Sequence, residues 1–465
     1  MKKKIFTISI LIVLVLFGFV SCGKKAEQPA ATTVTTTTTT APKAEATVAP
    51  KAEAPKAEAP KAAKPVTIEF WTHEDVNRQK LEDRYIAEFT AANPNVTINV
   101  TRQSAEKLIE LVQTAFAAGQ GPTVFNLSVN DEYPYIAAGR VAPMNYQSAG
   151  YKSADDVKAS YAPKMLDPVT YDGEVYGLPL ELTNWCIYIN KRDFIDAGLD
   201  PEKDFPRTWE DMIRISQQIA LYDGDILVRR GYDFRYKYYL ENCVPMVEQL
   251  GGALISEDGK EAIVGKDAWV KWLTFMQEWG PNGYNLGSPT YTAARKLFNK
   301  ANGDMAMCST GLYQEARIKA DNPDFYNSGD WMVVPYPVFE DAVNDTAACY
   351  YGHYYMVNAD ADKATQDAAW AFISYMLSHG EEYLETVQII QPTTALFESE
   401  TFKSLPYSDV FKSDMDRGHI VYYGNASTAI QSALDTAVKA VMLQNVAPDE
   451  AYKQLKETVQ ELIEE

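Results

Sequence analysis

The hydrophobic positions that follow residue 65 change between two periods. Residues 66–71 and 96–100 alternate apolar and polar side chains, which is typical of strands. Residues 77–92 and 104–119 instead repeat apolar side chains at helical spacing, and residues 122–127 return to a strand-like run. Because this order of strands and helices favours a parallel sheet with right-handed crossovers, we predict an α/β lobe that begins at residue 66.

The stretch from residue 171 to residue 191 predicts a passage between two lobes. A turn at Asp172-Gly173 opens it, and Pro179 holds the residue before it extended. Residues 187–189, Ile-Tyr-Ile, form a β-branched run suited to a new buried strand. Residues 181–185 connect the two strands, and we expect a ligand to lie against this connection.

Polar and aromatic side chains follow the first and third predicted strands. Trp71, His73 and Glu74 lie at the end of the first strand, and Asp131 lies just after the third. In open α/β sheets, ligands bind beyond the carboxyl ends of the strands. We therefore expect the loops at these strand ends to face a binding cleft.

The N-terminal residues predict export and lipid anchoring. Residues 1–4 are mostly basic and residues 5–20 are apolar, which is the pattern of a secretory signal. This apolar run is shorter than the roughly 20 residues that a membrane-spanning helix needs. Residues 19–22, Phe-Val-Ser-Cys, resemble a bacterial lipobox. We predict a lipoprotein signal peptide over residues 1–21, with cleavage before Cys22 and lipid on Cys22.

Residues 22–65 have the composition of a tether. A threonine run at residues 35–40 is followed by Lys-Ala-Glu-Ala-Pro repeats at residues 51–55 and 56–60. With almost no aromatic or large apolar side chains, such a segment cannot bury enough surface to fold. We predict a passive spacer between the lipid and the folded part of the chain.

Net charge disfavours several classes of partner. The whole chain carries a net charge of −20, and because residues 1–65 contribute +6, the remainder carries −26. The long-range field of so acidic a surface disfavours nucleic acid and anionic ligands. It does not decide between a neutral sugar and a cation.

The sequence predicts neither a metal site nor a cofactor. The cysteines beyond Cys22 are Cys186, Cys243, Cys308 and Cys349. They lack CxxC spacing, and the four histidines form no HxxxH pair. Export permits disulfides, but the spacing does not determine a pairing. Gly259-Lys260 lacks the other residues of a phosphate-binding P-loop.

Several motifs stand in one order along the folded part of the chain. YDGEVYGLPL at 171–180 and YINK at 188–191 come first, followed by PRTWE at 206–210. FNKANGDMAM at 298–307 and YYGH at 350–353 come later. In this order and spacing the motifs resemble the family 1 extracellular solute-binding proteins, which are sugar-capturing receptors of ABC importers.

This resemblance implies an α/β, two-lobed periplasmic-binding-protein-like fold with three interlobe crossings. It places the N-terminal lobe at residues 66–182 plus 349–391 and the C-terminal lobe at residues 183–348 plus 392–465. The protein is then expected to be an exported bacterial lipoprotein, anchored to a membrane at Cys22 on its periplasmic or cell-surface side. We expect a monomer that binds a mono- or oligosaccharide for ABC permease subunits, without catalysis, cofactor or nucleic acid.

A sugar presents C–H faces that stack on aromatic rings and hydroxyls that bond to planar polar groups. The stacking candidates are Trp71, Trp185, Tyr236 and Tyr313. The polar candidates are His73, Glu74, Asp131, Glu181, Asn184, Arg235 and His353. For each of them, packing in a core or exposure at the surface is the competing interpretation. Trp209, at a predicted helix start, is assigned to packing.

Three other functions stay open. A polyamine or quaternary amine could be enclosed by tyrosines and balanced by Glu74 or Asp131. The protein could report a bound sugar to a chemoreceptor instead of delivering it to a permease. Hydrolysis of a glycoside, the least favoured of the three, would need paired carboxylates such as Glu181 and Asp131, whose separation the sequence does not give.

Overall fold

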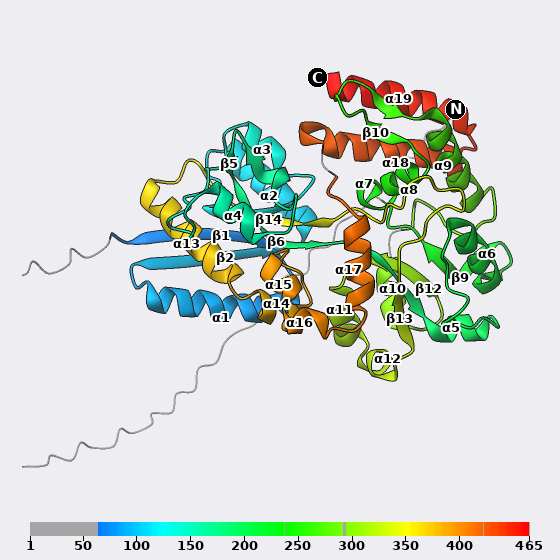
Figure 1. The fold of residues 1–465 in the computed structure, drawn as a ribbon, viewed down its shortest axis with the longest axis horizontal. Helices are drawn as coiled ribbons and strands as arrows, with labels where there is room; N and C mark the ends of the chain where they lie inside the picture. Colours follow the sequence, from blue (N-terminus) through cyan, green and yellow to red (C-terminus); the bar gives the residue numbers. More distant parts are fainter. Residues whose placement is uncertain (1–63, 237, 292–293, 422, 465) are drawn as a thin grey trace, which may run out of the picture. The chain divides into compact units, whose positions relative to one another are not determined.

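The computed structural model describes residues 64–236, 238–291, 294–421 and 423–464 (Figure 1). Residues 62–465 form a compact unit of their own. The predicted signal peptide, the lipid site at Cys22 and nearly all of the predicted tether lie outside the described residues. Among the helices that are described, none is both long and apolar enough to cross a membrane.

The first sheet contains the predicted parallel strands. Its order is β2-β1-β3-β14-β6. The bounds are Val66–His73 for β1, Val96–Gln103 for β2, Val124–Ser128 for β3, Gly177–Thr183 for β6 and Tyr351–Val357 for β14. β1 pairs in parallel with β2 and β3, which confirms the α/β prediction. β14 runs antiparallel between β3 and β6, so a segment from far along the chain enters this sheet.

The second sheet begins directly after the predicted passage. Its order is β13-β7-β12-β9-β8. The bounds are Cys186–Asn190 for β7, Leu221–Asp223 for β8, Ile226–Asp233 for β9, Met305–Thr310 for β12 and Trp331–Val334 for β13. β7 is fully buried, as its β-branched run predicts. The sequence did not predict β8, because its three residues are exposed and too few to show a period.

Two short hairpins stand outside these sheets. β4 (Thr170–Tyr171) pairs with β5 (Glu174–Val175), which confirms the predicted turn. Asp172 and Gly173 adopt positive φ angles of 50° and 83° there, a conformation that suits these residue types. β10 (Ala253–Ile255) pairs with β11 (Ala262–Val264).

Helices and two short 3₁₀ segments surround the sheets (Figure 1). The first group comprises α1 (Val76–Ala92), α2 (Ala105–Ala117), α3 (Tyr133–Ala137), α4 (Ala154–Ser160), η1 (Asp167–Val169), α5 (Lys191–Asp196), α6 (Trp209–Ile219), α7 (Tyr239–Asn242), α8 (Val244–Gln249), α9 (Lys266–Trp279) and α10 (Ala294–Lys300). The second comprises α11 (Gln314–Asp321), α12 (Pro323–Ser328), α13 (Lys363–Leu377), α14 (Gly380–Val387), α15 (Thr394–Glu398), α16 (Glu400–Lys403), α17 (Ser408–Arg417), η2 (Gly424–Ala426), α18 (Ser427–Leu443) and α19 (Pro448–Glu464).

Aromatic side chains attach helices to both faces of the first sheet. On one face, the ring of Phe372 in α13 lies 5.4 Å from that of Phe70 in β1. On the other face, Phe116 of α2 lies 5.2 Å from Phe125 of β3. The faces are opposite because Phe70 pairs with the residue before Phe125, and successive strand residues point to opposite sides. Coverage of both faces explains why β3 is buried throughout, whereas β1 keeps Thr67 and Glu69 exposed.

The second core is organised around Trp209, which is fully buried at the start of α6. Its ring lies 5.1 Å from that of Tyr336 and 5.8 Å from that of Phe234. Its Nε1 donates to Oε1 of Gln249 at 3.1 Å, so the indole N–H is satisfied inside the core. The prediction that Trp209 packs rather than binds is confirmed.

The first passage between the sheets is short. β6 ends at Thr183 and β7 begins at Cys186, so only Asn184 and Trp185 separate the two strands. Asn184 Nδ2 donates to the carbonyl of Phe411 in α17 at 3.2 Å. α17 belongs to the last passage: the carbonyl of Ile390 still accepts from the backbone N–H of Leu182 in β6, and α17, further along the chain, contacts β7. The first and last passages are thereby joined.

The second passage enters the first sheet at β14, where backbone approaches backbone closely. Tyr351 pairs with Thr183, and Gly352 pairs with Leu182. A Cβ atom on Gly352 would lie 1.8 Å from the carbonyl oxygen of Glu181, which is far inside van der Waals contact. Only glycine fits at this position. Because glycine has no side chain, β14 approaches β6 closely, and the neighbouring His353 lies next to Glu181.

We predict that Gly352→Ala destabilises the protein by about 1–3 kcal/mol or more, because the added methyl forces β14 away from β6. Chemical unfolding of the full-length chain measures this loss. Gly380→Ala is the matched control, since its methyl meets only the flexible end of Gln391 within 3.4 Å, the Oε1 atom at 2.9 Å. Equal loss of stability in both variants would contradict the close-approach explanation.

Candidate functional site

A cavity of about 130 Å³ lies at the carboxyl ends of β1 and β3. The first sheet and its loops contribute polar side chains to its lining, among them His73, Asn126, Ser128, Asn130, Asp131 and His353. The side of the second sheet contributes Tyr238, Thr428 and Gln431. The cavity therefore stands between the two sheets, where the strand-end rule places a ligand.

Two histidines of the cavity lining, His73 and His353, lie beside a carboxylate, Glu181, that stands behind the lining. The rings of His73 and His353 stack with their centroids 4.0 Å apart. Nδ1 of His353 lies 3.2 Å from Oε1 of Glu181, and Nε2 of His73 lies 3.8 Å from the same oxygen. Burial, followed by the charges of His353 and Arg78, lowers the pKa of His73 well below its usual value, so this ring is neutral.

The side chains of His73, Glu181 and His353 are close enough to one another to be considered as metal ligands. One ligand atom of each lies within 4.8 Å of the others. The two rings are nearly parallel, however, with an angle of 27° between them, so their lone pairs do not converge on one point. Nε2 of His73 also lies 3.0 Å from Nη1 of Arg78, a permanent cation. This geometry suits hydrogen bonding to a ligand better than metal binding.

One wall of the cavity carries hydrogen bonds that join the two sheets. Ser128 Oγ donates to Oδ2 of Asp131 at 2.5 Å, and Thr428 Oγ1 donates to its Oδ1 at 3.4 Å. Asn130 Nδ2 donates to Oε1 of Glu241 at 2.6 Å. Because Asp131 and Asn130 follow β3 while Thr428 and Glu241 belong to the opposite side, these bonds link the two sides of the cavity.

Aromatic rings form the facing wall. Tyr238 and Tyr351 meet edge to face with centroids 5.4 Å apart, and Tyr351 lies 5.4 Å from His353. Trp185 is fully buried behind them, 5.3 Å from Tyr238. The guanidinium of Arg235 lies over both rings, 4.1 Å from the centroid of Trp185 and 4.6 Å from that of Tyr238. This packing immobilises Arg235.

Arg235 leads to a second group of polar side chains around Tyr313. Its Nη1 donates to the Tyr313 hydroxyl at 3.0 Å. The guanidinium of Arg317 stands over the Tyr313 ring at 4.4 Å, and its Nη2 lies 3.6 Å from Oδ2 of Asp75. Burial alone raises the pKa of Tyr313, but Arg235, Arg317 and Arg295 together outweigh it and hold that pKa below its ordinary value.

The structure brings part of the predicted set together. His73, Asp131 and His353 line the cavity. Glu181, Trp185, Arg235 and Tyr313 lie behind this lining and reach it through the contacts described above. Whether any of these residues binds a ligand stays a prediction.

Four predicted residues lie elsewhere. Trp71 is half-buried in β1 and packs against the first core, and Tyr236 is buried in the second core. Glu74 has an exposed side chain. Asn184 is buried and bonded to α17. Their burial and packing favour structural roles for Trp71, Tyr236 and Asn184, and no contact connects these four side chains to the cavity lining within the described part of the chain.

Sequence reasoning did not select several lining residues. Asn130 and Tyr238 occupy loops whose polar and aromatic composition alone gives no reason to choose them. Tyr351 offered a weak signal, since it stands two positions before His353 and alternate strand residues share a face. Arg295 and Arg317, which act on Tyr313 and do not line the cavity, were not selected either, because they lie on helices, where a basic residue is normally expected at the surface.

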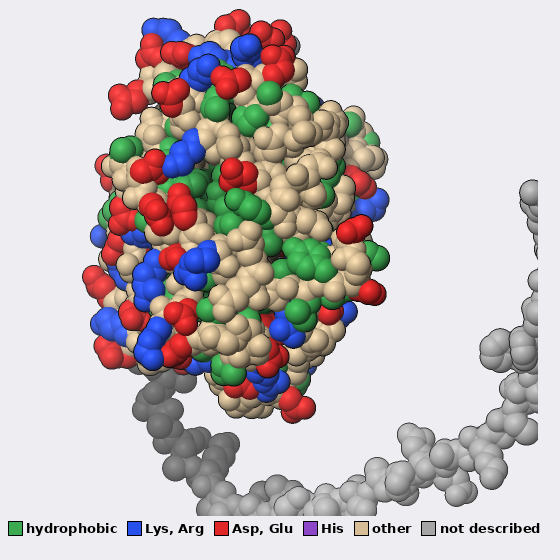
Figure 2. Space-filling model, turned by 90° about the vertical axis from the view of Figure 1, so that its right-hand side faces the viewer, with side chains coloured by type: hydrophobic (Ala, Val, Ile, Leu, Met, Phe, Trp, Pro, Cys, Tyr) green, Lys and Arg blue, Asp and Glu red, His purple; other side chains and the backbone are tan. Residues whose placement is uncertain are grey.

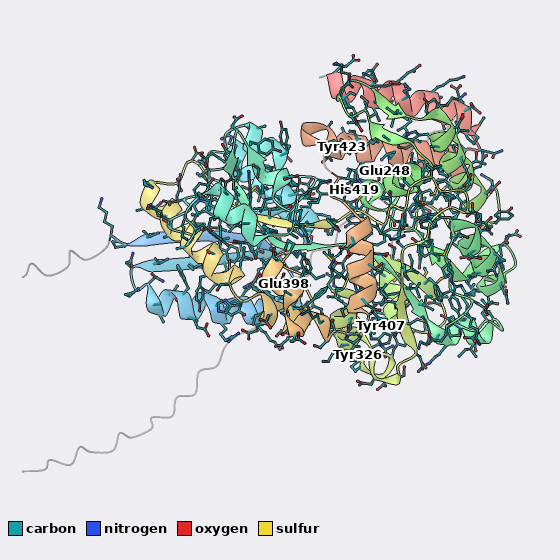
Figure 3. All side chains as sticks on the ribbon, in the orientation of Figure 1. Glu248, Tyr326, Glu398, Tyr407, His419 and Tyr423 are labelled. Carbon is teal, nitrogen blue, oxygen red and sulfur yellow. The ribbon has the colours of Figure 1, made fainter. Side chains whose placement is uncertain are left out.

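A further titratable group lies away from the cavity, where the chain leaves α17 (Figure 3). His419 Nε2 stands 3.3 Å from Oε1 of Glu248, with Tyr423 labelled nearby. The Cys349 thiol lies 3.7 Å from the same imidazole nitrogen, and burial raises its pKa well above the usual value. This thiol is therefore protonated and packed rather than reactive.

Comparison with known proteins assigns the class. Residues 84–407 match the family described as bacterial extracellular solute-binding protein. The chain belongs to this family.

Individual relatives are distant. The lactose-binding protein of Rhizobium radiobacter is 22% identical over 388 residues, which cover 79% of this chain and 86% of that protein. The glycerol-3-phosphate-binding protein UgpB of Shigella flexneri is 24% identical over 54% of this chain and 58% of its own length. The match to a Brucella abortus binding protein, at 26% identity, spans only 31% of the length of that curated relative.

Solved structures share the fold over most of the chain. The GacH receptor of Streptomyces glaucescens has a TM-score of 0.73 at 17% identity, with 87% of this chain and 100% of that chain covered. A Thermotoga lettingae ABC transporter solute-binding protein, bound with α-D-tagatose, has a TM-score of 0.72 at 19% identity, with coverage of 86% and 100%. The expected two-lobed periplasmic-binding-protein fold is confirmed.

We predict that Glu241 makes stability fall as pH rises. Burial is the main cause that raises the pKa of this carboxyl from 4.5 to about 7. The folded chain therefore holds this proton more tightly than the unfolded chain, so the stabilisation is complete below pH 4.5 and is lost as pH approaches 7. The loss is on the order of 3 kcal/mol, and Glu241→Gln should remove it.

The measurement is chemical unfolding of the full-length chain between pH 4.5 and 8. Glu457→Gln, at an exposed position of α19, serves as the control and should follow the wild-type profile. Parallel profiles for wild type and Glu241→Gln would contradict the prediction.

Proposed function

We propose that this protein is a lipid-anchored extracytoplasmic receptor that captures a small carbohydrate between two lobes and delivers it to an ABC permease. The observation that carries the proposal is the cavity between the sheets, which combines aromatic rings with polar side chains from both sides. Membership of an extracellular solute-binding family supports binding without turnover.

The two walls fit the two surfaces of a sugar. Tyr238 and Tyr351 offer rings to the C–H faces of a pyranose. Ser128, Asn130 and Asp131 stand opposite them and offer donors and acceptors to its hydroxyls. A wall of one kind alone would give affinity without orientation, whereas the two together select a flat, hydroxylated molecule.

Closure of the lobes is the proposed mechanism. The bonds from Asn130 to Glu241 and from Thr428 to Asp131 join the two sides of the cavity. A solute that contacts both sides makes all of its contacts only when the two sides of the cavity close on it. Its binding free energy therefore favours the closed form and shifts the population toward it. The permease then recognises that closed shape. The GacH receptor, whose solved structures include a complex with acarbose, supports a carbohydrate as the class of ligand.

Export and attachment belong to the same proposal. A lipid on Cys22 and a spacer over residues 22–65 would hold the receptor at the outer side of a membrane, near its permease. The lobes are proposed at residues 66–182 plus 349–391 and 183–348 plus 392–465, in a monomer without cofactor. A polyamine or quaternary amine is disfavoured, because Arg235 lies against Tyr238 of the cavity lining and would repel a cation.

We predict that a carbohydrate raises the melting temperature of the full-length chain, because a ligand that binds only the folded form stabilises it by mass action. A panel of mono- and oligosaccharides, scanned by differential scanning fluorimetry in detergent, identifies it. Tyr238→Ala should weaken the best ligand about tenfold by isothermal titration calorimetry, since one aromatic contact is worth roughly 1.5 kcal/mol.

Tyr284→Ala is the matched control, because this tyrosine is 47% exposed and does not line the cavity. Absence of any stabilising carbohydrate would remove the proposal. Release of reducing ends from an oligosaccharide, lost in Glu181→Gln, would replace it with a glycosidase.

We predict that Cys22→Ala abolishes incorporation of a labelled fatty acid and releases the protein from membranes, because lipid attachment needs the thiol. Metabolic labelling and membrane fractionation measure both effects. Cys243→Ala, at a buried cysteine of the described chain, should leave labelling unchanged. Labelling that persists in Cys22→Ala would place the lipid elsewhere or remove it from the mechanism.

A further inference from the structure

Three arginines gather around one tyrosine beside the cavity. Arg235 follows β9, Arg295 lies in α10 and Arg317 lies in α11, so they come from separate parts of the second lobe. Arg235 donates to the hydroxyl of Tyr313, and Arg317 stands over its ring. The charge of Arg295 acts on the same hydroxyl together with theirs. The group defined by these three arginines and Tyr313 is called the arginine cluster below.

The arginine cluster is partly buried and has few carboxylate partners: Arg317 is 32% exposed, and Arg235 and Arg295 are half-buried. Within the described part of the chain, Asp75 alone comes within 4.0 Å of any of the three, at 3.6 Å from Arg317. Oδ1 of Asp75 is already engaged, because it accepts from the backbone N–H groups of Asn77 and Arg78 at the start of α1. Two of the three positive charges therefore have no ion-pair partner among the described residues.

The hydrogen-bond donors of the cluster are also incompletely used. A guanidinium carries five N–H donors. The guanidinium of Arg235 makes one hydrogen bond, to Tyr313, among the described residues. Nη1 of Arg295 is buried and has no partner there. An unsatisfied charged donor away from water is costly, so Arg295 Nη1 would gain from an acceptor that the described residues do not supply.

The positive charges of the cluster also act on the pKa of Arg295. Burial, then the neighbouring charges of Arg317 and Arg235, lower the pKa of Arg295 to about 10. At neutral pH the group still carries its charge. Positive charges therefore lie close together in the cluster although they repel one another.

The position of the cluster connects it to the cavity. The Tyr238 ring lines the cavity, and the guanidinium of Arg235 lies 4.6 Å from its centroid. The same guanidinium lies 4.1 Å from the centroid of the Trp185 ring. Stacking fixes the plane of Arg235 before any ligand arrives. A planar guanidinium with free donors matches a carboxylate or a phosphate better than a hydroxyl.

We propose that the bound solute is an acidic saccharide whose carboxylate or phosphate is bound by Arg235, Arg295 and Tyr313, with Arg317 closing the site from the Asp75 side. The inference rests on the proposed function and specifies its class of substrate. Neutral sugars would leave the two unpaired charges uncompensated.

This assignment differs from what net charge alone indicates. On the face shown in Figure 2, Asp and Glu side chains are interspersed with Lys and Arg side chains, and the chain as a whole is acidic. Such a surface slows the approach of an anion, but its field is screened within about 10 Å at ordinary salt concentration. Contacts inside the cavity are screened much less, so they determine which solute is retained.

The first experiment compares matched ligands on the full-length chain in detergent. D-Galacturonate, D-glucuronate and glucose 6-phosphate are titrated beside galactose and glucose by isothermal titration calorimetry. We expect at least one acidic sugar to bind more than about tenfold tighter than its neutral counterpart, because charge-assisted bidentate hydrogen bonds are stronger than hydrogen bonds to a neutral hydroxyl. The uronate and phosphate arms separate the two kinds of anionic group.

The second experiment uses Arg295→Gln and Arg235→Gln. Each should weaken the acidic ligand about 30-fold and its neutral counterpart less than about threefold, because truncation leaves the bound anion unpaired. The ligand-free Arg295→Gln protein should melt at or above the wild-type temperature, since an unpaired buried charge is removed. Arg214→Gln, at a 57% exposed side chain, is the matched control and should bind as wild type.

The outcomes separate this inference from the proposed function. Neutral sugars that bind as tightly as acidic ones, with no effect of Arg295→Gln, would overturn the inference and leave the receptor proposal intact. Failure of acidic and neutral sugars alike would overturn both. A lower melting temperature of ligand-free Arg295→Gln, with ligand preference unchanged, would assign the cluster to structure instead.

Discussion

The close joining of the two sheets is the constraint on which the rest of the structure depends. Two residues, Asn184 and Trp185, separate β6 from β7, and Gly352 allows β14 to press against the backbone of Glu181. Because this connection is so short, the strand ends of the two sheets lie close together. His73, His353 and Glu181 meet there because three distant segments converge on the same edge.

Charged side chains are dispersed over the surface of the molecule, whereas a few charged side chains lie close to one another in the interior. The acidic surface interacts weakly with distant charges because solvent screens it. Inside, a few groups are held in defined pairs: Glu181 with His353, Glu241 with Asn130, and Arg317 with Asp75. Arg235 and Arg295 stand apart from this pattern, since they have no carboxylate partner within the described chain. The missing carboxylates distinguish these two arginines from the paired groups.

Local sequence patterns predicted the elements well and the site only in part. The strands before residue 128 and the turn at Asp172-Gly173 follow from periodicity and backbone preference, which act over a few residues. His73 and Asp131 line the cavity, as expected for residues at strand ends that share one edge of a sheet, and their binding role stays a prediction. Tyr238 and Asn130 were not found, since their role depends on which loops face each other across the cavity.

The sequence by itself determined the α/β class, the order of the elements and the place of the passage between lobes, because hydrophobic period, turn residues and β-branching are properties of neighbouring residues. Only the tertiary structure decided which side chains share an environment. Trp71, predicted as a stacking residue, packs against a core, whereas Arg295, which no sequence pattern singled out, is close enough to Arg235 for their charges to interact. Burial and long-range electrostatics arise from convergence in space, and they cannot be read from spacing along a chain.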